Sequence, residues 1–398
     1  MPVTKHQPNQ DTSLDEWVDW FWASFLPGWV SRACANPGIG FYDLLDCDGQ
    51  PAQQDRRTIL AQARLLYTFS HLALISDNAA FHEASRIARE AVQAFRKKPG
   101  LYCLARNAEG QQTADSQDEL TRSYDQSFVI LGLATWGRLH PTEAGAELEA
   151  CWSILDGQLT DPATGLLLEH NALPDPKAPS APARAQNPHM HNYEAALQAF
   201  EMTGNMKWLE RAASMRAKGL EYFFDHDSGT ITEFVAPDLS ILPGREGMRR
   251  EIGHQCEWAW LLMREAELGG DPSTNEIAAR LFAFADQHGH AQVGAMRGAV
   301  FDAVAADASW REDKFLLWPQ TEAIKTHAVR ARDDEHAQKA KALTLMMFQR
   351  FFAGRAAFAN QLDASGQVLW PDALSRLLYH VVLALTEGAR AGLWKYPD

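Results

Sequence analysis

Apolar residues recur along this chain at spacings of three and four, the period of one helix face, while alternating strand-like patterns are scarce. The periodic segments are either strongly apolar or amphipathic and charged, and the two kinds largely alternate. They predict about twelve helices. The expected helices cover residues 14–31, 56–76, 82–97, 119–139, 142–159, 187–204, 206–224, 251–268, 273–288, 313–331, 335–353 and 372–388.

One polar or aromatic anchor can be chosen from each of six strongly apolar helices, and these anchors recur at a nearly fixed period. They are separated by 61, 66, 63, 64 and 62 positions and are Arg64, Asp125, His191, His254, Trp318 and His380. A fixed period indicates a repeat architecture, in which each helical hairpin buries its apolar helix against its neighbours. Unrelated helix positions are the alternative, because the choice of anchors is free.

Six hairpins can stack into an open solenoid or close into a ring. An open solenoid usually has a longer shared consensus, whereas these units share little beyond anchor position and the anchors differ in chemistry. We therefore predict an all-α ring of six hairpins in one domain, residues 1–398. Six apolar helices would lie inside, six charged helices outside, and all anchors would converge at one end.

Composition narrows the class of protein. The chain has 398 residues, 46% hydrophobic and 22% charged, which is typical of a globular protein with a large core. A net charge of −14 argues against nucleic-acid and anionic-membrane partners, and no apolar run approaches the ~18 residues of a membrane span. The N-terminus lacks a signal pattern, and the five scattered cysteines fit free thiols. We expect a cytoplasmic protein.

In a closed ring the anchors and their neighbours would face one cavity, with three histidines among carboxylates, an arginine and a tryptophan. Two chemistries fit these residue types: a metal site, or metal-free proton transfer by histidines with Arg64 polarising a carbonyl oxygen. No HExxH or other strong metal spacing occurs, and His189 and His191 would point to different sides of a helix. We therefore expect neither a metal nor another cofactor.

The stretch EIGHQCEWAW, residues 251–260, holds the clearest pair. His254 and Glu257 are three residues apart, so they share a helix face, and a carboxylate can fix the tautomer of a histidine that acts as acid or base. A histidine with a purely structural role is the alternative for any single position.

Six segments resemble the N-acylglucosamine 2-epimerase superfamily, in order and over nearly the whole chain. They are QARLLYTFSHLAL (62–74), YDQSFVILGLA (124–134), NPHMHNYEAALQAFEMTG (187–204), GHQCEWAWLL (253–262), WPQTEAI (318–324) and LYHVVLA (378–384). The resemblance implies an (α/α)6 barrel and metal-free proton transfer at C2 of a free sugar, in agreement with the ring expected from the spacing.

The resemblance also implies roles for individual positions. His254 and His380 match the family's proton-transferring pair, and Glu257 matches the carboxylate beside the first of them. His191 matches the histidine linked to ring opening, and Arg64 the arginine near the sugar's C1 and C2 oxygens. The remaining matches are pocket residues, namely Tyr124, Asn187, Trp318 and the acidic Glu322; the anchor Asp125 is added to them as a substrate-binding candidate.

The ending RLLYH, residues 376–380, resembles the mannose isomerase branch of that superfamily. The segment PGREGMRRE, residues 243–251, departs from the family pattern, and among its arginines Arg245 is our choice for substrate contact over Arg249 and Arg250. We expect a monomer or homodimer that interconverts D-mannose and D-fructose, or lyxose and xylulose, through a cis-enediol. A sugar 2-epimerase shares that intermediate and stays open, as do an (α/α)6 glycoside hydrolase and a non-catalytic sugar-binding scaffold.

Overall fold

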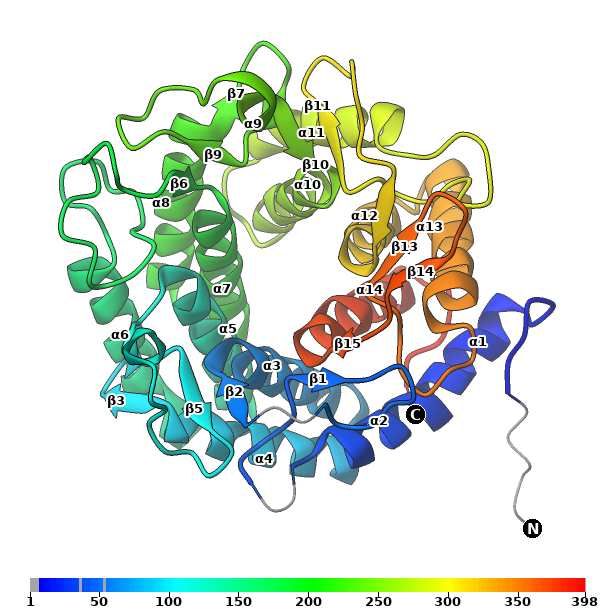
Figure 1. The fold of residues 1–398 in the computed structure, drawn as a ribbon, viewed down its shortest axis with the longest axis horizontal. Coiled ribbons are helices and arrows are strands. Elements are labelled where there is room, and N and C mark those ends of the chain that lie inside the picture. Colours follow the sequence, from blue (N-terminus) through cyan, green and yellow to red (C-terminus); the bar gives the residue numbers. More distant parts are fainter. Residues whose placement is uncertain (1–6, 36–37, 53–54, 398) are drawn as a thin grey trace.

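Two concentric rings of helices form the protein in the computed structural model, which describes residues 7–35, 38–52 and 55–397 (Figure 1). The inner ring holds α3 (Ile59–Ser76), α5 (Ser123–Leu139), α7 (Asn187–Thr203), α10 (Ile252–Glu267), α12 (Leu317–Val329) and α14 (Leu378–Arg390). The outer ring holds α4 (Ala79–Ala94), α6 (Pro141–Gln158), α8 (Met206–Phe223), α11 (Thr274–His288) and α13 (Asp334–Met347). The predicted (α/α)6 barrel of apolar inner and charged outer helices is confirmed.

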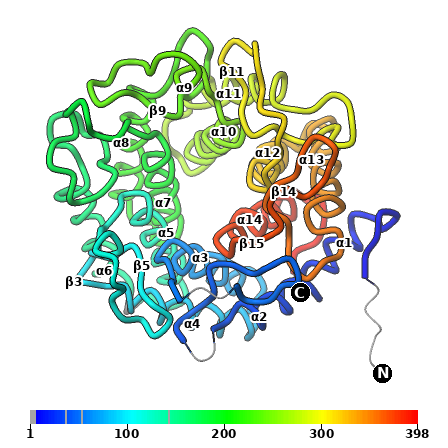
Figure 2. The backbone as a smooth tube through the Cα atoms, in the orientation of Figure 1, coloured from blue at the N-terminus to red at the C-terminus, as the bar shows by residue number. Residues whose placement is uncertain are grey.

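The N-terminal segment supplies the sixth outer position and closes the ring. It runs through α1 (Leu14–Trp20), the π-helical turn η1 (Phe21–Phe25) and α2 (Leu26–Ala33), and it begins with a capping box between Ser13 and Glu16. It lies beside α13 and the π-helical turn η3 (Phe348–Phe352), as the blue and orange segments of Figure 2 show. Trp17 stacks on Phe348 with ring centroids 5.6 Å apart, so aromatic packing joins the first helix to the last outer one.

Short strands border one end of the barrel, and their pairing repeats around the ring. A strand just before an inner helix pairs with a strand that follows the outer helix of the same unit. Such pairs are β2 (Arg56–Thr58) with β5 (Ala105–Asn107), β6 (Arg184–Ala185) with β9 (Phe234–Val235), β10 (Arg249–Glu251) with β11 (Ala303–Ala305), and β12 (Lys314–Leu316) with β13 (Gln361–Asp363). At the closure, β15 (Ala373–Leu374) pairs with β1 (Leu44–Leu45) after α2.

Smaller elements complete the loops outside these pairs. They are β3 (Arg96–Lys98), β4 (Leu101–Tyr102), β7 (Phe224–Asp225), β8 (Thr230–Ile231), β14 (Val368–Trp370), α9 (Gly244–Met248), and the 3-10 turns η2 (Ser116–Glu119) and η4 (Ser375–Leu377). No helix of the described ranges is long and apolar enough to cross a membrane.

Buried glutamines near the start of inner helices hold the preceding outer loop in place. The amide of Gln320 in α12 exchanges two hydrogen bonds with the backbone of Val300, both 2.8 Å long. Gln255 in α10 does the same with Ile231, at 2.8 and 3.0 Å. Gln62 in α3 pairs likewise with Phe41. Each clamp satisfies buried backbone groups that no strand partner covers, and it fixes where the inner helix begins.

Four helices begin three or more residues later than the sequence predicts, among them the expected helix 56–76, which starts at Ile59 because residues 56–58 form β2. The expected helices 119–139, 313–331 and 372–388 start at Ser123, Leu317 and Leu378, because the residues in front of them pair as strands or bridges or form 3-10 turns. The apolar residues of these segments continue the helical period. Their backbone groups nevertheless form hydrogen bonds with another loop instead of the i to i+4 hydrogen bonds of a helix. The stretch 40–51 pairs with β15 through β1, and with itself through a bridge between Leu45 and Pro51.

Candidate active site

A cavity of about 490 Å³ opens at the end of the barrel where the inner helices begin. It is lined by Arg64, Arg122, Tyr124, Glu169, Ala185, Asn187, Pro188, His191, Glu233, Phe234, Glu251, His254, Glu257, Trp318, Arg376, Leu377 and His380. All six inner helices, or the residues just before them, contribute to this lining. The repeat thus brings polar, charged and apolar side chains that are far apart in the sequence into one cavity.

His380 lies near the start of α14 with both ring nitrogens engaged. Its Nδ1 is 2.8 Å from the Glu322 carboxylate, and its Nε2 is 3.2 Å from the Arg64 guanidinium. Because an arginine can only donate and a carboxylate accepts, the ring is neutral, with its proton on Nδ1 and a lone pair on Nε2. Burial, Arg64 and the cation of Lys325 hold the pKa of His380 well below its usual value. His380 therefore has the form of a general base.

His254 has the opposite protonation state. Its Nδ1 lies 2.7 Å from Glu233 and 3.2 Å from Glu251. Burial opposes protonation of the ring, but the two carboxylates outweigh it and raise the pKa of His254 to about 10. The Trp318 ring lies between the two histidines, with centroids 4.9 Å from His254 and 6.1 Å from His380. A protonated acid and a neutral base thus flank one aromatic surface.

Close packing at Trp318 explains the glycine beside His254. A Cβ atom on Gly253 would come within 2.2 Å of the Trp318 ring. Only glycine lets the ring approach the start of α10 this closely, and the approach brings Trp318 against His254.

His191 in α7 is neutral and carries its own carboxylate. Its Nδ1 is 2.9 Å from Glu194, which also accepts a hydrogen bond from the Tyr379 hydroxyl, and 3.8 Å from Glu257. Burial outweighs Glu194 and lowers the pKa of His191 to about 4. The Glu257 carboxyl has no hydrogen-bond partner among the described residues, and burial, reinforced by Glu322, raises its pKa well above the usual value. Glu257 is therefore a neutral acid facing His191.

Arg64 connects the base to the rest of the cavity. Besides His380, its guanidinium donates to the Tyr124 hydroxyl over 2.8 Å and to the backbone carbonyl of Arg376 over 3.4 Å. It packs on the Phe128 ring at 4.0 Å. A fixed cation next to the lone pair of a base is the arrangement that stabilises an oxyanion formed when that base removes a proton.

The structure brings together eight of the predicted site residues, which all line the cavity: Arg64, Tyr124, Asn187, His191, His254, Glu257, Trp318 and His380. Glu322 lies behind His380 as its hydrogen-bond partner, so it contacts the base rather than the cavity. Asp125 is buried away from the lining, and its carboxylate has no hydrogen-bond partner in the described chain. Burial raises the pKa of Asp125 to about 6.

Two predicted positions are corrected. Arg245 lies outside the cavity: its side chain is 64% exposed and packs on Trp310 at 4.1 Å, because the short helix α9 faces solvent. The carboxylate beside His254 is Glu233 and not Glu257, since Glu257 faces His191 on the neighbouring inner helix α7. His254 and Glu257 do lie in the same helix, as their spacing predicts. The His254 ring, however, is oriented so that its Nδ1 pairs with Glu233.

Residues that the sequence reasoning missed carry much of the electrostatics. Glu194 and Glu251 each lie three residues from a cavity histidine, a spacing that could have indicated them. Glu233 comes from the loop at β9 and Arg376 from η4, where no helical spacing points to them. Arg122 lines the cavity in an ion pair with Glu169 at 2.6 Å.

Two groups at the cavity have residue types that could hold a metal ion: His191 with Glu194 and Glu257, and His254 with Glu233 and Glu251. In each group the histidine already uses Nδ1 to pair with a carboxylate, and one of the acids is in its neutral form or shared with another donor. Ion pairing and hydrogen bonding thus account for both groups as acid/base units.

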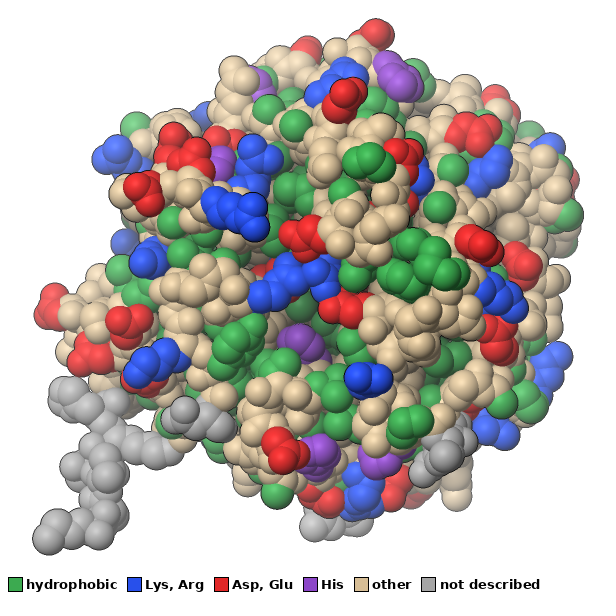
Figure 3. Space-filling model, turned by 180° about the vertical axis from the view of Figure 1, so that it is seen from behind, with side chains coloured by type: hydrophobic (Ala, Val, Ile, Leu, Met, Phe, Trp, Pro, Cys, Tyr) green, Lys and Arg blue, Asp and Glu red, His purple; other side chains and the backbone are tan. Residues whose placement is uncertain are grey.

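A second, smaller hollow of about 220 Å³ lies at the opposite end of the barrel, near the centre of the face that Figure 3 shows. Charged side chains gather around it, among them Glu201, Arg264, Glu387 and Arg390. Glu194 also lines this hollow, and its carboxylate contacts His191 of the first cavity.

Comparison with known proteins identifies the class of enzyme to which this (α/α)6 barrel belongs, the sugar isomerases and epimerases. The chain belongs to the N-acylglucosamine 2-epimerase (GlcNAc 2-epimerase) family, whose model matches residues 40–384. Similarity to proteins named as isomerases supports a sugar isomerase enzyme within that family.

Three similar proteins illustrate the relationship. A protein named mannose-6-phosphate isomerase from Rhizobium meliloti (strain 1021) is 29% identical over 389 residues, covering 94% of this chain and 95% of its own. A D-mannose isomerase from Marinomonas mediterranea is 26% identical over 264 residues, 63% of this chain and 64% of its own. The crystal structure of a D-mannose isomerase has a TM-score of 0.80 at 19% identity, covering 98% of this chain and all of that one.

Proposed function

We propose that the protein interconverts D-mannose and D-fructose by metal-free proton transfer through a cis-enediol. The observation that carries this proposal is the opposite protonation of two histidines across Trp318, with Arg64 beside the neutral one. Groups whose surroundings push their pKa values apart are suited to act as acid and base in one reaction. The names of the similar proteins favour mannose as the substrate.

In the proposed reaction the open-chain aldose binds with C1 and C2 next to Arg64 and His380. The Nε2 lone pair of His380 removes the C2 proton, and the electrons move onto O1, where Arg64 and the imidazolium of His254 stabilise the charge. His254 protonates O1 to give the enediol. It then accepts the O2 proton while His380 returns its proton to C1, which forms the ketose and restores both histidines. His191 and the neutral Glu257 assist the opening of the pyranose ring.

The test is incubation with mannose in heavy water, followed by NMR at early times. We expect fructose as the main product, glucose as a minor one, and incomplete deuterium at C1 because one histidine carries the proton. Glucose that outruns fructose would make the protein a 2-epimerase. A new reducing end from a disaccharide would indicate a hydrolase, and unchanged sugar a binding scaffold.

The assignment of the histidines is tested by His380→Gln and His254→Gln. Each should lower kcat by roughly 10²–10⁴-fold, the typical contribution of general acid/base catalysis, while the circular dichroism spectrum stays that of the folded barrel. Near-normal kcat in either variant would make that histidine structural.

Arg376 favours a phosphorylated sugar as a second candidate substrate. Its guanidinium lines the cavity and has neither a hydrogen bond nor an ion pair with the described residues, although burial and Arg64 lower its pKa. Asp43 and Asp125 act on this cation only from beyond ion-pair distance, so it can pair with an anionic group on the substrate. One similar protein is named mannose-6-phosphate isomerase. We would compare kcat/KM for mannose and mannose 6-phosphate in wild type and Arg376→Gln. A larger loss for the phosphorylated sugar supports this candidate, and equal losses reject it.

A further inference from the structure

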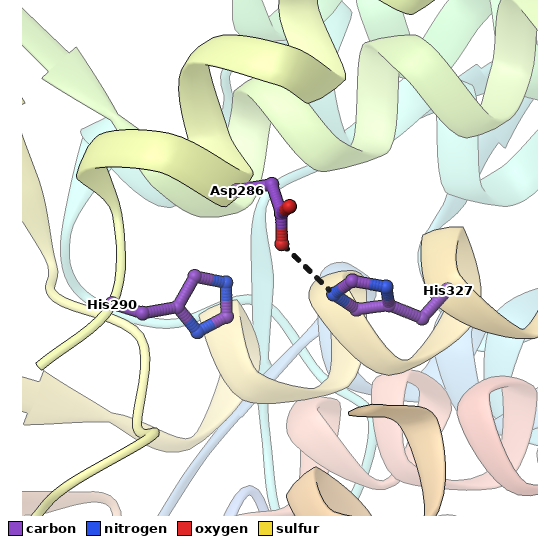
Figure 4. A group of neighbouring side chains, drawn as sticks. All are labelled: Asp286, His290 and His327. Carbon is purple, nitrogen blue, oxygen red and sulfur yellow. Dashed lines mark ion pairs between the residues drawn. The ribbon is translucent and has the colours of Figure 1, made fainter. Parts of the chain in front are cut away.

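A cluster of metal-ligand residue types lies in the wall of the barrel, apart from the catalytic cavity. Asp286 is in the last turn of α11, His290 in the loop that follows it, and His327 near the end of α12 (Figure 4). One potential ligand atom from each residue lies within 4.8 Å of the other two. None of the three lines the cavity that holds His254 and His380. Two imidazoles with one carboxylate form the ligand set that zinc and its neighbours in the first transition series prefer.

His327 presents a buried nitrogen with nothing to bind. Its side chain is fully buried, and its Nε2 has no hydrogen-bond partner among the described residues. That atom points toward the Asp286 carboxylate, 3.7 Å away, which is too long for a hydrogen bond. A buried polar atom that loses water without gaining a partner costs free energy. A ligand between His327 and Asp286 would remove that cost.

His290 is oriented for the same purpose. Its Nδ1 is 3.0 Å from the backbone carbonyl of Gly298. Because a carbonyl only accepts, Nδ1 carries the proton and the lone pair of the neutral ring is on Nε2. A backbone carbonyl that fixes the tautomer in this way is the usual outer partner of a metal-binding histidine. Burial lowers the pKa of His290, and it lowers that of His327 to about 3, so both rings are neutral.

The Nδ1 of His327 is 3.1 Å from the Nδ1 of His336. When His327 donates this hydrogen bond, its Nε2 carries the lone pair that a metal needs. His336 then holds its proton on Nε2 and gives up a long contact of 3.4 Å from Arg330. Metal binding would therefore cost only the weak contact between His336 and the partly exposed Arg330.

We propose that Asp286, His290 and His327 bind one divalent transition metal ion of the zinc class, which ties α11 and its following loop to α12. Metal–ligand bonds of about 2.0–2.2 Å place tetrahedral ligands roughly 3.3 Å apart, so no two ligand atoms need to approach by more than about 1.5 Å. His290 is only partly buried and stands on a loop, so it can make this movement. An adjacent cavity of about 410 Å³, lined by Asp286 and His290, gives the ion an entry path and leaves room for a water ligand.

Lys339 competes with the ion for Asp286. Its Nζ lies 3.0 and 2.9 Å from the two carboxylate oxygens of Asp286, and it also lies 2.9 Å from Glu335 on its own helix. Arg297 lines the same cavity and adds a second positive charge. Metal binding transfers Lys339 to Glu335. Removal of the Lys339 charge should consequently tighten metal binding, an effect opposite to that of removing a ligand.

The full-length chain, stripped of metal with a chelator, is titrated with Zn²⁺ in competition with a chromogenic zinc chelator, and with Co²⁺ monitored by its visible absorption. We expect one ion per chain and a rise in Tm on Zn²⁺ binding. His290→Ala should weaken binding at least roughly tenfold and abolish the Tm shift. Lys339→Met should bind more tightly than wild type. Neither variant changes the fully buried His327, so both should fold and the test does not depend on a change in the barrel wall.

Two controls locate the ion. His288→Ala removes a neighbouring histidine outside the cluster and should bind Zn²⁺ as wild type does. His254→Gln removes a histidine of the catalytic cavity and should also keep the full stoichiometry. The proposal is overturned if His290→Ala binds Zn²⁺ unchanged, if Lys339→Met does not bind more tightly, or if His254→Gln is the variant that loses the ion. Chelation should leave the initial rate of sugar conversion unchanged, because no cluster residue touches the catalytic cavity.

Discussion

His254 and His380 are the same residue type in the same cavity, yet their neighbours give them opposite charges. Two carboxylates face His254, whereas Arg64 and Lys325 act on His380 and only one carboxylate touches it. The distinction depends on Glu233 and Lys325, which sequence spacing did not select. The positions of both histidines could be predicted from the repeat, but not which of them is the acid, because charge depends on contacts between separate helices.

Glu233→Gln tests what keeps His254 protonated. Loss of the carboxylate should move the pKa of His254 down from about 10 toward its ordinary value near 6.5. In wild type the form with protonated His254 should persist up to about pH 10. The pair's contribution to stability is full below about 6.5 and is lost as pH rises through about 10. The alkaline limb of kcat/KM should therefore shift to lower pH in the variant, and Glu246→Gln, on exposed α9, should leave it in place.

Lys325→Met tests what keeps His380 neutral. Lys325 is fully buried, pairs with Glu322 at 2.6 Å and lies 4.2 Å from the Trp260 ring. Burial opposes its charge, but Glu322, Glu257 and Glu194 together outweigh burial and raise the pKa of Lys325. Without this cation His380 should bind a proton more readily, so the acid limb of kcat/KM should move to higher pH. Lys341→Met, on the exposed side of α13, is the matched control. An unmoved acid limb would remove Lys325 from the account of the base.

At the scale of elements, the hydrophobic period correctly located every long helix but not the starts of several inner ones. The residues 314–316 and 373–374 continue the apolar pattern, yet they form β12 and β15 because backbone partners from another loop are available. Such pairings join residues that are tens of positions apart, so a local pattern does not contain them. The glutamine clamps had a sequence signal, since Gln62, Gln255 and Gln320 recur near the starts of inner helices.

Gln320→Leu tests one clamp. The change leaves the N–H and C=O of Val300 buried without their side-chain partners, which should cost about 1–3 kcal/mol for each unsatisfied group. We expect a lower urea midpoint with an unchanged m-value, and a lower kcat because Trp318 lies two residues away. Gln287→Leu, on the exposed face of α11, should change neither. Wild-type stability in Gln320→Leu would mean that water replaces the amide.

At the scale of the whole molecule, ring closure was predictable from the near-constant spacing of anchors with different chemistry. The spacing could not show how the ring closes, because the N-terminal helix enters as an outer helix whose inner partner, α14, lies at the other end of the chain. Trp17 and Phe348 mark that closure. The candidate active-site cavity depends on this closure, since the contact between His380 of α14 and Arg64 of α3 crosses the same seam.

Trp17→Ala tests the closure. Loss of a buried tryptophan should cost about 3–5 kcal/mol and lower Tm. In a double-mutant cycle with Phe348→Ala, the coupling energy should be roughly 0.5–1.5 kcal/mol, as for stacked aromatic pairs. Urea unfolding followed by fluorescence and by circular dichroism gives both values. Strictly additive effects would mean that the two rings stabilise separate parts of the molecule.

The strand pairs at the mouth of the barrel tie down both ends of each loop that borders the cavity. The segment entering an inner helix is joined to the segment leaving its outer helix. The loop residues between one strand pair and the next can therefore change in length or sequence without moving His254 or His380. The rim is therefore interchangeable, and a rim loop transplanted from a relative should alter which sugar is admitted while the proton transfer itself is retained.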